Sequence, residues 1–192
     1  MKMINMLEIK KLACFALVAL LLASCSKEEA YMEDEMIKVS NATITTNDLI
    51  GHWELSRMVS DTAVNLNQDG SYSTNLLDET SCFNNMSITF NSDATFVTNN
   101  ATMTFESGSN GDQFACIADR IDTGTWKVEN DNLILTMEIN GSTYTHTKAL
   151  DMTGNTFNFD VTKIESDQYV NDPGNTQASE IRILELEYTK VE

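Results

Sequence analysis

Four cysteines and two histidines are the residues of this sequence best suited to covalent or metal chemistry. His52 and His146 fall in different expected strands, and neither has a cysteine or carboxylate cluster at the spacing of a zinc site. The stretch Asn65–Gly70 alternates oxygen-bearing side chains as calcium loops do, but Leu76 stands where such a loop needs a glutamate. There is no Gly-x-Ser-x-Gly stretch, and abundant carboxylates alone do not single out a hydrolytic pair. We therefore predict no catalytic residue, no cofactor and no metal, and a hydrolase is the least favoured alternative.

The N-terminal segment carries a cysteine at the point where an apolar run stops. Lysines precede the run from Leu12 to Ala23, which is shorter than the roughly 20 residues of a membrane-spanning helix. The stretch Leu22-Ala23-Ser24-Cys25 resembles the lipobox of bacterial lipoproteins. That resemblance implies a signal peptide over residues 1–24, a diacylglycerol on the Cys25 sulfur, and acylation of the new amine by a fatty acid such as palmitate. An ordinary secretory signal with an incidental cysteine is the alternative.

A charged stretch follows Cys25 directly. Lys27-Glu28-Glu29 resembles the export signal of Sus-type glycan-uptake lipoproteins, which are carried to the outer face of the outer membrane. The alternative is a spacer whose charges only keep it solvated. We predict that residues 25–45 form an acidic, lipid-anchored tether, and that the protein is anchored in the outer membrane facing the cell surface.

Charge and cysteine content narrow the function classes further. The chain has a formal net charge of −17, which repels nucleic-acid phosphates, so no nucleic-acid partner is expected. Signal cleavage and lipidation would account for Cys14 and Cys25, leaving Cys82 and Cys116. In an oxidising envelope this even remainder suggests a disulfide, with two unrelated buried thiols as the alternative.

Alternation of apolar and polar residues dominates the sequence from Trp53 almost to the C-terminus, as in half-buried strands. Residues 60–81 are predicted to form a long polar loop, and residues 156–164 a strand. Turn signals separate the other runs, at 91–94, 107–111, 129–132, 140–141 and 153–154. About 8–10 short strands predict an all-β fold over residues 46–192, an antiparallel up-and-down β-barrel.

The order of tryptophans and cysteines favours this barrel over an immunoglobulin-type sandwich. Such a sandwich places its core tryptophan between the two bridged cysteines. In this sequence Trp53 precedes both Cys82 and Cys116, and Trp126 follows both. The sequence therefore favours the barrel.

Three short motifs, in this order, carry a family resemblance. They are Gly51-His52-Trp53, the hairpin stretch Ile88–Phe96 and Gly124-Thr125-Trp126, with Cys82 between the first two. Together they resemble the lipocalin-like lipoproteins of glycan-using Gram-negative bacteria. Ala94 departs from the pattern, because that hairpin usually has a glycine there. Asp61-Thr62-Ala63 also resembles a surface O-glycosylation acceptor of such bacteria.

The resemblance implies a structural role for Trp53. In lipocalins the tryptophan of Gly-x-Trp plugs the closed end of the barrel beneath an arginine from late in the chain. Arg182 is the expected partner, with Arg120 as the second choice. A cation over an indole face contributes about 0.5–2 kcal/mol, depending on its burial.

A barrel of about eight strands has just enough interior for side chains or for one ligand, and we predict a ligand. Eight adaptable apolar or aromatic side chains are expected to line a cup for a small apolar or amphipathic molecule: Phe90, Phe96, Met103, Phe105, Met137, Tyr144, Phe157 and Phe159. The alternative is that these side chains simply fill the core. A filled barrel would then be an interaction module that docks to another outer-membrane protein.

Overall fold

The computed structural model describes residues 43–105, 114–139, 141–171 and 181–191. The predicted signal peptide, Cys25, the Lys27-Glu28-Glu29 triplet and the turn at 107–111 lie outside these ranges. Within the described ranges, no helix is long and apolar enough to cross a membrane.

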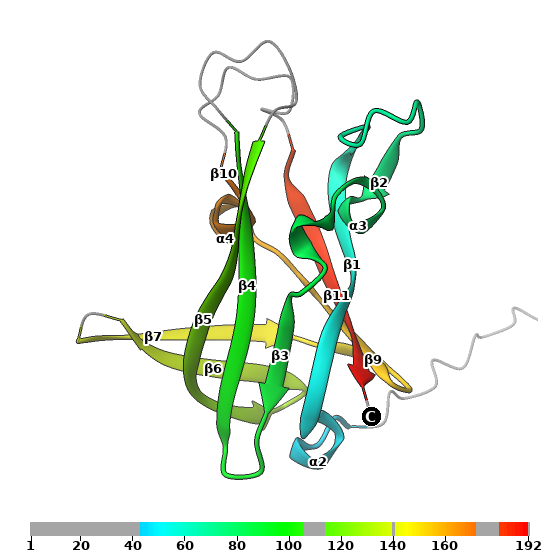
Figure 1. The fold of residues 1–192 in the computed structure, drawn as a ribbon. Coiled ribbons are helices and arrows are strands. Elements are labelled where there is room, and N and C mark those ends of the chain that lie inside the picture. Colours follow the sequence, from blue (N-terminus) through cyan, green and yellow to red (C-terminus); the bar gives the residue numbers. More distant parts are fainter. Residues whose placement is uncertain (1–42, 106–113, 140, 172–180, 192) are drawn as a thin grey trace, which may run out of the picture. The chain divides into compact units, whose positions relative to one another are not determined.

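The described chain folds around one 11-stranded sheet (Figure 1). Its strands follow the order β7-β6-β5-β4-β3-β1-β11-β9-β8, with β2 beside β1 and β10 beside β4. All pairs are antiparallel except β10 with β4. The strands are β1 (Gly51–Val64), β2 (Ser73–Asn75), β3 (Ser87–Phe90), β4 (Thr95–Phe105), β5 (Phe114–Glu129), β6 (Asn132–Ile139), β7 (Ser142–Ala149), β8 (Asp151–Thr153), β9 (Thr156–Asp160), β10 (Val170–Asn171) and β11 (Ile183–Val191).

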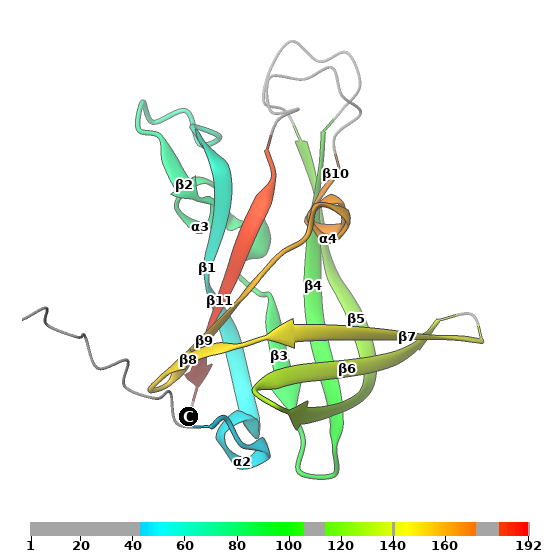
Figure 2. The same ribbon diagram turned by 180° about the vertical axis from the view of Figure 1, so that it is seen from behind.

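The sheet is strongly curled, and its two ends approach each other (Figure 2). β7 at one end comes close to β9 near the other, where the Lys148 ammonium donates a hydrogen bond to the Asp160 carbonyl at 3.0 Å. Successive side chains of a strand face opposite sides, so in β3 Ile88 and Phe90 are buried while their neighbours are half-buried. This architecture confirms the all-β, antiparallel barrel class predicted from the sequence.

The segment predicted as a polar loop, residues 60–81, is mostly ordered structure. β1 runs on to Val64, β2 pairs with it, and a short helix α3 (Leu76–Glu79) leads into a 3-10 turn η1 (Ser81–Phe83). Leu76 is completely buried, and the buried Glu79 carboxylate accepts a hydrogen bond from the Leu66 amide at 2.9 Å. The loop prediction was wrong. The segment is largely polar in composition, but the buried contacts of Leu76 and Glu79 are enough to hold it in regular secondary structure.

The predicted strand over residues 156–164 is also corrected. β9 ends at Asp160, and helix α4 (Lys163–Tyr169) begins after the N-cap Thr162. Thr162 and Glu165 form a capping box, in which the Thr162 amide donates to the Glu165 carboxylate at 2.8 Å. This local hydrogen bonding ends the strand and starts the helix. Another short helix, α2 (Thr46–Leu49), precedes β1.

The predicted disulfide between Cys82 and Cys116 is confirmed. The S–S distance is 2.05 Å, and the two Cα atoms are 5.5 Å apart. The bridge joins η1, just before β3, to β5, which is two strands further along the sheet. The disulfide therefore links η1 to β5 covalently, while hydrogen bonds pair β3 with β4 and β4 with β5.

The hairpin between β3 and β4 shows why glycine is usual at position 94. Ala94 has a φ of 65°, in the left-handed region that disfavours side chains with a Cβ. The turn is held by the Asp93 carboxylate, which accepts from the Thr95 amide at 3.0 Å, and by the Trp126 amide, which donates to the Ala94 carbonyl at 2.9 Å. The predicted turn at 91–94 is confirmed, with alanine in the strained position.

Gly124, in the Gly-Thr-Trp motif of β5, lies opposite Phe96 in the ladder with β4. A Cβ at Gly124 would lie 2.1 Å from the Thr136 carbonyl oxygen and 2.8 Å from Cε1 of Phe96. Only glycine leaves room for β6 on one side and an aromatic ring on the other. Trp126, two residues later, is buried and packs on Phe90 with ring centroids 4.8 Å apart.

Candidate ligand-binding site

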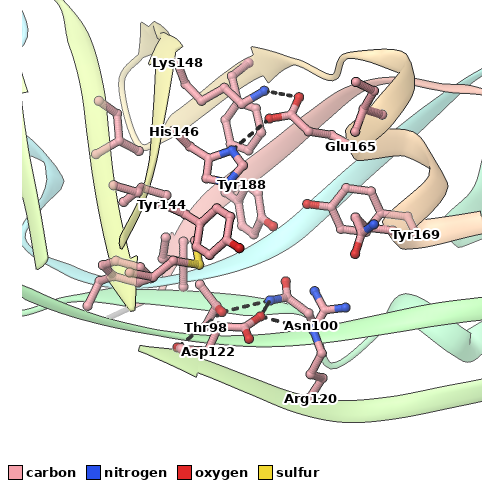
Figure 3. A pocket seen from close by; sticks show the side chains of 18 residues that line it. Thr98, Asn100, Arg120, Asp122, Tyr144, His146, Lys148, Glu165, Tyr169 and Tyr188 are labelled. Carbon is pink, nitrogen blue, oxygen red and sulfur yellow. Dashed lines mark hydrogen bonds and ion pairs between the residues drawn. The ribbon is translucent and has the colours of Figure 1, made fainter. Parts of the chain in front are cut away.

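A cavity of about 640 Å³ lies inside the curled sheet, with helix α4 at one side (Figure 3). Its apolar wall comes mainly from β3, β4, β6 and β9, through Ile88, Phe96, Leu133, Leu135, Met137 and Phe159. Cavities of this volume accept drug-sized ligands, usually with an apolar lining and a few fixed polar groups. The polar groups here form two clusters on opposite sides.

Four of the eight predicted lining residues contact this cavity: Phe96, Met137, Tyr144 and Phe159. The other four, Phe90, Met103, Phe105 and Phe157, are buried in the core and do not line it. Phe157, for example, packs against Trp53 with ring centroids 4.7 Å apart. For these four, the prediction of a lining role was wrong, because neighbouring aromatic and aliphatic side chains cover them.

The first polar cluster is built by the ladder between β4 and β5. Thr98 pairs with Asp122, and Asn100 pairs with Arg120, so their side chains share the inner face. The Asp122 carboxylate accepts from the Arg120 Nε at 3.1 Å and from the Asn100 amide at 2.9 Å. The Asn100 amide also donates to the Thr98 hydroxyl at 2.8 Å. The pairing of β4 with β5 shifts register between Asn100 and Thr102, and Asp119 on β5 has a φ of 63° at this point. The cluster therefore ends before the two strands reach the disulfide.

The second polar cluster links β7 to α4. The Lys148 ammonium contacts the Glu165 carboxylate, and His146 Nδ1 lies 3.3 Å from the other oxygen of Glu165. Burial alone would raise the pKa of Glu165, but Lys148 and the hydrogen bonds from Thr162 outweigh it and lower that pKa to about 2. Glu165 is therefore ionised at neutral pH and holds the helix against β7.

Three tyrosine hydroxyls complete the polar part of the cavity. Tyr144 comes from β7, Tyr169 from the end of α4 and Tyr188 from β11, and Figure 3 shows Tyr144 and Tyr169 reaching inward from opposite sides. None of the three hydroxyls has a hydrogen-bond partner among the described residues. Burial, followed by the charge of Glu165, raises the pKa of Tyr169 to about 12, and burial raises the pKa of Tyr188 well above its ordinary value. Both phenols therefore keep their protons.

Sequence reasoning did not assign Asp122, His146, Lys148, Glu165, Tyr169 or Tyr188 to the cavity. Part of the signal was present in the stretch Tyr144-Thr-His-Thr-Lys148, where large polar side chains alternate with threonines. In a strand this spacing places Tyr144, His146 and Lys148 on one face, as the structure shows. The capping pair Thr162 and Glu165 was a second local signal, for a helix start.

The predicted cation over Trp53 is a different residue. Trp53 is completely buried, and its indole N–H donates to the Leu49 carbonyl at 2.7 Å. Lys190 Nζ lies 5.1 Å from the ring centroid, because Lys190 is the ladder partner of Trp53 across β1 and β11. Arg182 lies at the other end of that ladder, where its amide donates to the Asp61 carboxylate. The predictions of Arg182 and, as second choice, Arg120 were both wrong.

The polar clusters contain no recognisable metal site. Across the described ranges of the chain, no group of three or more histidine, cysteine, aspartate or glutamate side chains could hold a metal ion. His52 lies outside the cavity, where its Nδ1 is 2.8 Å from the Thr89 hydroxyl. His146 faces the cavity but contacts only Glu165 among charged groups.

Comparison with known families agrees with this architecture. Residues 49–159 match the family described as the lipocalin-like domain, which is more than half of the chain. The chain belongs to this family. The match covers the bridged Cys82 and Cys116 and the strands β3 to β7, whereas Glu165, Tyr169 and Tyr188 come from α4 and β11 beyond it. Comparisons with curated proteins and with solved structures gave no match.

Proposed function

We propose that the lipocalin-like domain binds one small amphipathic molecule in the cavity and does not act on it chemically. The observation that carries this proposal is the cavity of about 640 Å³, with apolar residues on one wall and polar side chains at its sides. Three tyrosine hydroxyls that have no partner among the described residues also support it, because ligand pockets combine apolar surface with a few well-placed hydrogen-bonding groups.

Filling the cavity with a larger side chain should weaken binding strongly. Leu135→Trp places an indole where the apolar wall now leaves space, and we expect the affinity for the neutral dye Nile red to fall about tenfold or more. The matched control is Thr145→Trp, on the neighbouring strand β7, where Thr145 alternates with the inward-facing Tyr144 and His146. This control should change the affinity less than twofold. Fluorescence titration measures both, and equal losses in the two variants would contradict the cavity as the site.

We also propose that the domain is displayed on the cell surface by a lipid on Cys25. The lipobox-like stretch supports the anchor, and Lys27-Glu28-Glu29 supports surface display. Two or three acyl chains would hold the protein firmly, at about 0.8 kcal/mol for each buried methylene.

The anchor has a direct test in a Gram-negative host. Cys25→Ala should incorporate no radiolabelled palmitate and should leave uncleaved precursor, whereas the wild-type chain is labelled. Replacing Lys27, Glu28 and Glu29 by alanine should leave the label but reduce cleavage by protease added outside intact cells. Label that persists in Cys25→Ala would refute the anchor. Unchanged cleavage of the triple variant would refute the export signal alone.

A further inference from the structure

Among the described residues, the guanidinium of Arg120 makes a hydrogen bond through only one of its three nitrogens. Its Nε donates to Asp122 at 3.1 Å, and its terminal nitrogens have no hydrogen-bond partner among the described residues. The Arg120 side chain is 43% exposed, and it lines the cavity. An arginine carries five N–H donors in a planar fork, so one guanidinium can bind two carboxylates at once.

The other cation of the cavity is already committed. Lys148 contacts Glu165, donates to the Asp160 carbonyl at 3.0 Å, and its side chain is only 13% exposed. Lys148 also lies over the Phe159 ring, 5.3 Å from the centroid. Lys148 therefore holds α4 against β7, and Arg120 is the cation with donors left for a ligand.

Two phenol donors line the same cavity as Arg120: Tyr169 at the end of α4 and Tyr188 on β11. Figure 3 shows Tyr169 facing the cavity above Arg120. Because both phenols stay protonated, each can donate a hydrogen bond to an oxygen atom of a ligand.

We infer that the ligand carries a carboxylate, which binds the free nitrogens of Arg120 and the hydroxyls of Tyr169 and Tyr188, while its apolar body lies against Ile88, Leu135 and Met137. This inference rests on the proposed binding function and specifies the ligand class, an amphipathic carboxylic acid. The terminal nitrogens of Arg120 and the two phenol hydroxyls are hydrogen-bond donors that line one cavity. A carboxylate offers two acceptor oxygens whose spacing matches the guanidinium fork.

The acidity of the chain opposes an anionic ligand. The formal net charge is −17, and Asp122 lies beside Arg120. Exposed charges further than about 8–10 Å away are largely screened at physiological ionic strength, however. Asp122 is not screened, but of the Arg120 nitrogens it accepts from Nε alone, so the two terminal nitrogens remain able to bind a ligand carboxylate. A neutral molecule of the same shape is the main competitor.

The test compares three probes with the same polyene chain: cis-parinaric acid, its methyl ester and the matching alcohol. At a pH where the acid is ionised, the wild-type domain should bind the acid about tenfold more tightly than the ester or the alcohol. Arg120→Gln should lose this preference, and Tyr169→Phe should reduce it about threefold. Lys127→Gln is the matched control, because Lys127 lies on the same strand with a 62% exposed side chain and loses the same charge.

Each result decides between the two proposals. Preference for the acid that disappears only in the Arg120 variant supports the inference. Equal affinities for acid, ester and alcohol would overturn it while leaving Nile red binding and the proposed function intact. Preference retained in Arg120→Gln, with unchanged circular dichroism, would overturn the role of Arg120. If neither Nile red nor any of the three probes binds the wild-type domain, the proposed function and this inference both fail.

Discussion

Gly124→Ala should destabilise the domain by about 3 kcal/mol or more. The new Cβ would lie 2.1 Å from the Thr136 carbonyl oxygen, which is backbone and cannot rotate away. β6 must therefore move away from β5, and the Phe96 ring, 2.8 Å from the new Cβ, must shift as well. Urea unfolding, with the slope of the transition compared between variants, measures the loss.

Gly154→Ala is the matched control for this prediction. Gly154 has a φ of 60° in the turn between β8 and β9, and no atom lies within 4 Å of a Cβ built there. The alanine at this position should cost about 1–2 kcal/mol from backbone strain alone. Both variants lose the same flexibility of glycine in the unfolded chain, so this contribution cancels between them. Gly124 has no positive φ, so a larger loss of stability in Gly124→Ala than in Gly154→Ala must come from the steric clash. Equal destabilisation would show that β6 can yield at Gly124 and would contradict the explanation of the motif.

Breaking the disulfide should lower the free energy of unfolding by roughly 2–5 kcal/mol. The bridge closes a segment with a sequence separation of 34, and it restricts the unfolded chain more than the folded one. Cys82→Ala, Cys116→Ala and the double variant should have similar unfolding midpoints, because all three lose the same bond. Protease sensitivity should rise first around η1 and the start of β5, since α3 keeps its own buried contact through Leu76.

Two measurements check the bridge directly. The unfolded, unreduced mature protein should show no alkylation of Cys82 or Cys116, and reduction should expose both thiols. Alkylation without reduction would mean that the bond is absent in solution. A double variant much less stable than either single variant would show that the two side chains stabilise the fold independently, contrary to the prediction.

Sequence patterns predicted the strands well because burial on one face imposes a strict alternation. The pair of positive φ values at Asn130 and Asp131, which form the turn between β5 and β6, agrees with the turn predicted there. The Cys82–Cys116 pair followed from simple counting. Each of these features is local or depends on few residues, so it can be recognised from the residue types in the sequence.

The cation over Trp53 could not be predicted in this way, because it depends on register. Arg182 and Lys190 both lie near the C-terminus, and only the pairing of β1 with β11 shows which of them is opposite Trp53. Similarly, Arg120 and Glu165 reach the same cavity from β5 and α4 only because the sheet curls. A one-residue shift of register would turn such side chains to the opposite face, so sequence spacing alone does not place them.

The position of β1 between β3 and β11 has a consequence for how the chain reaches this fold. Pairing of His52 with Val191 and of Trp53 with Lys190 joins the first long strand to the last. Contacts between residues so distant in sequence form slowly, because the intervening chain must be ordered before they add stability. A chain emerging from its N-terminus would present the unpaired edge of β1 until the 9 residues of β11 arrive. That edge is where incompletely folded molecules would associate, so β11 protects β1 from aggregation.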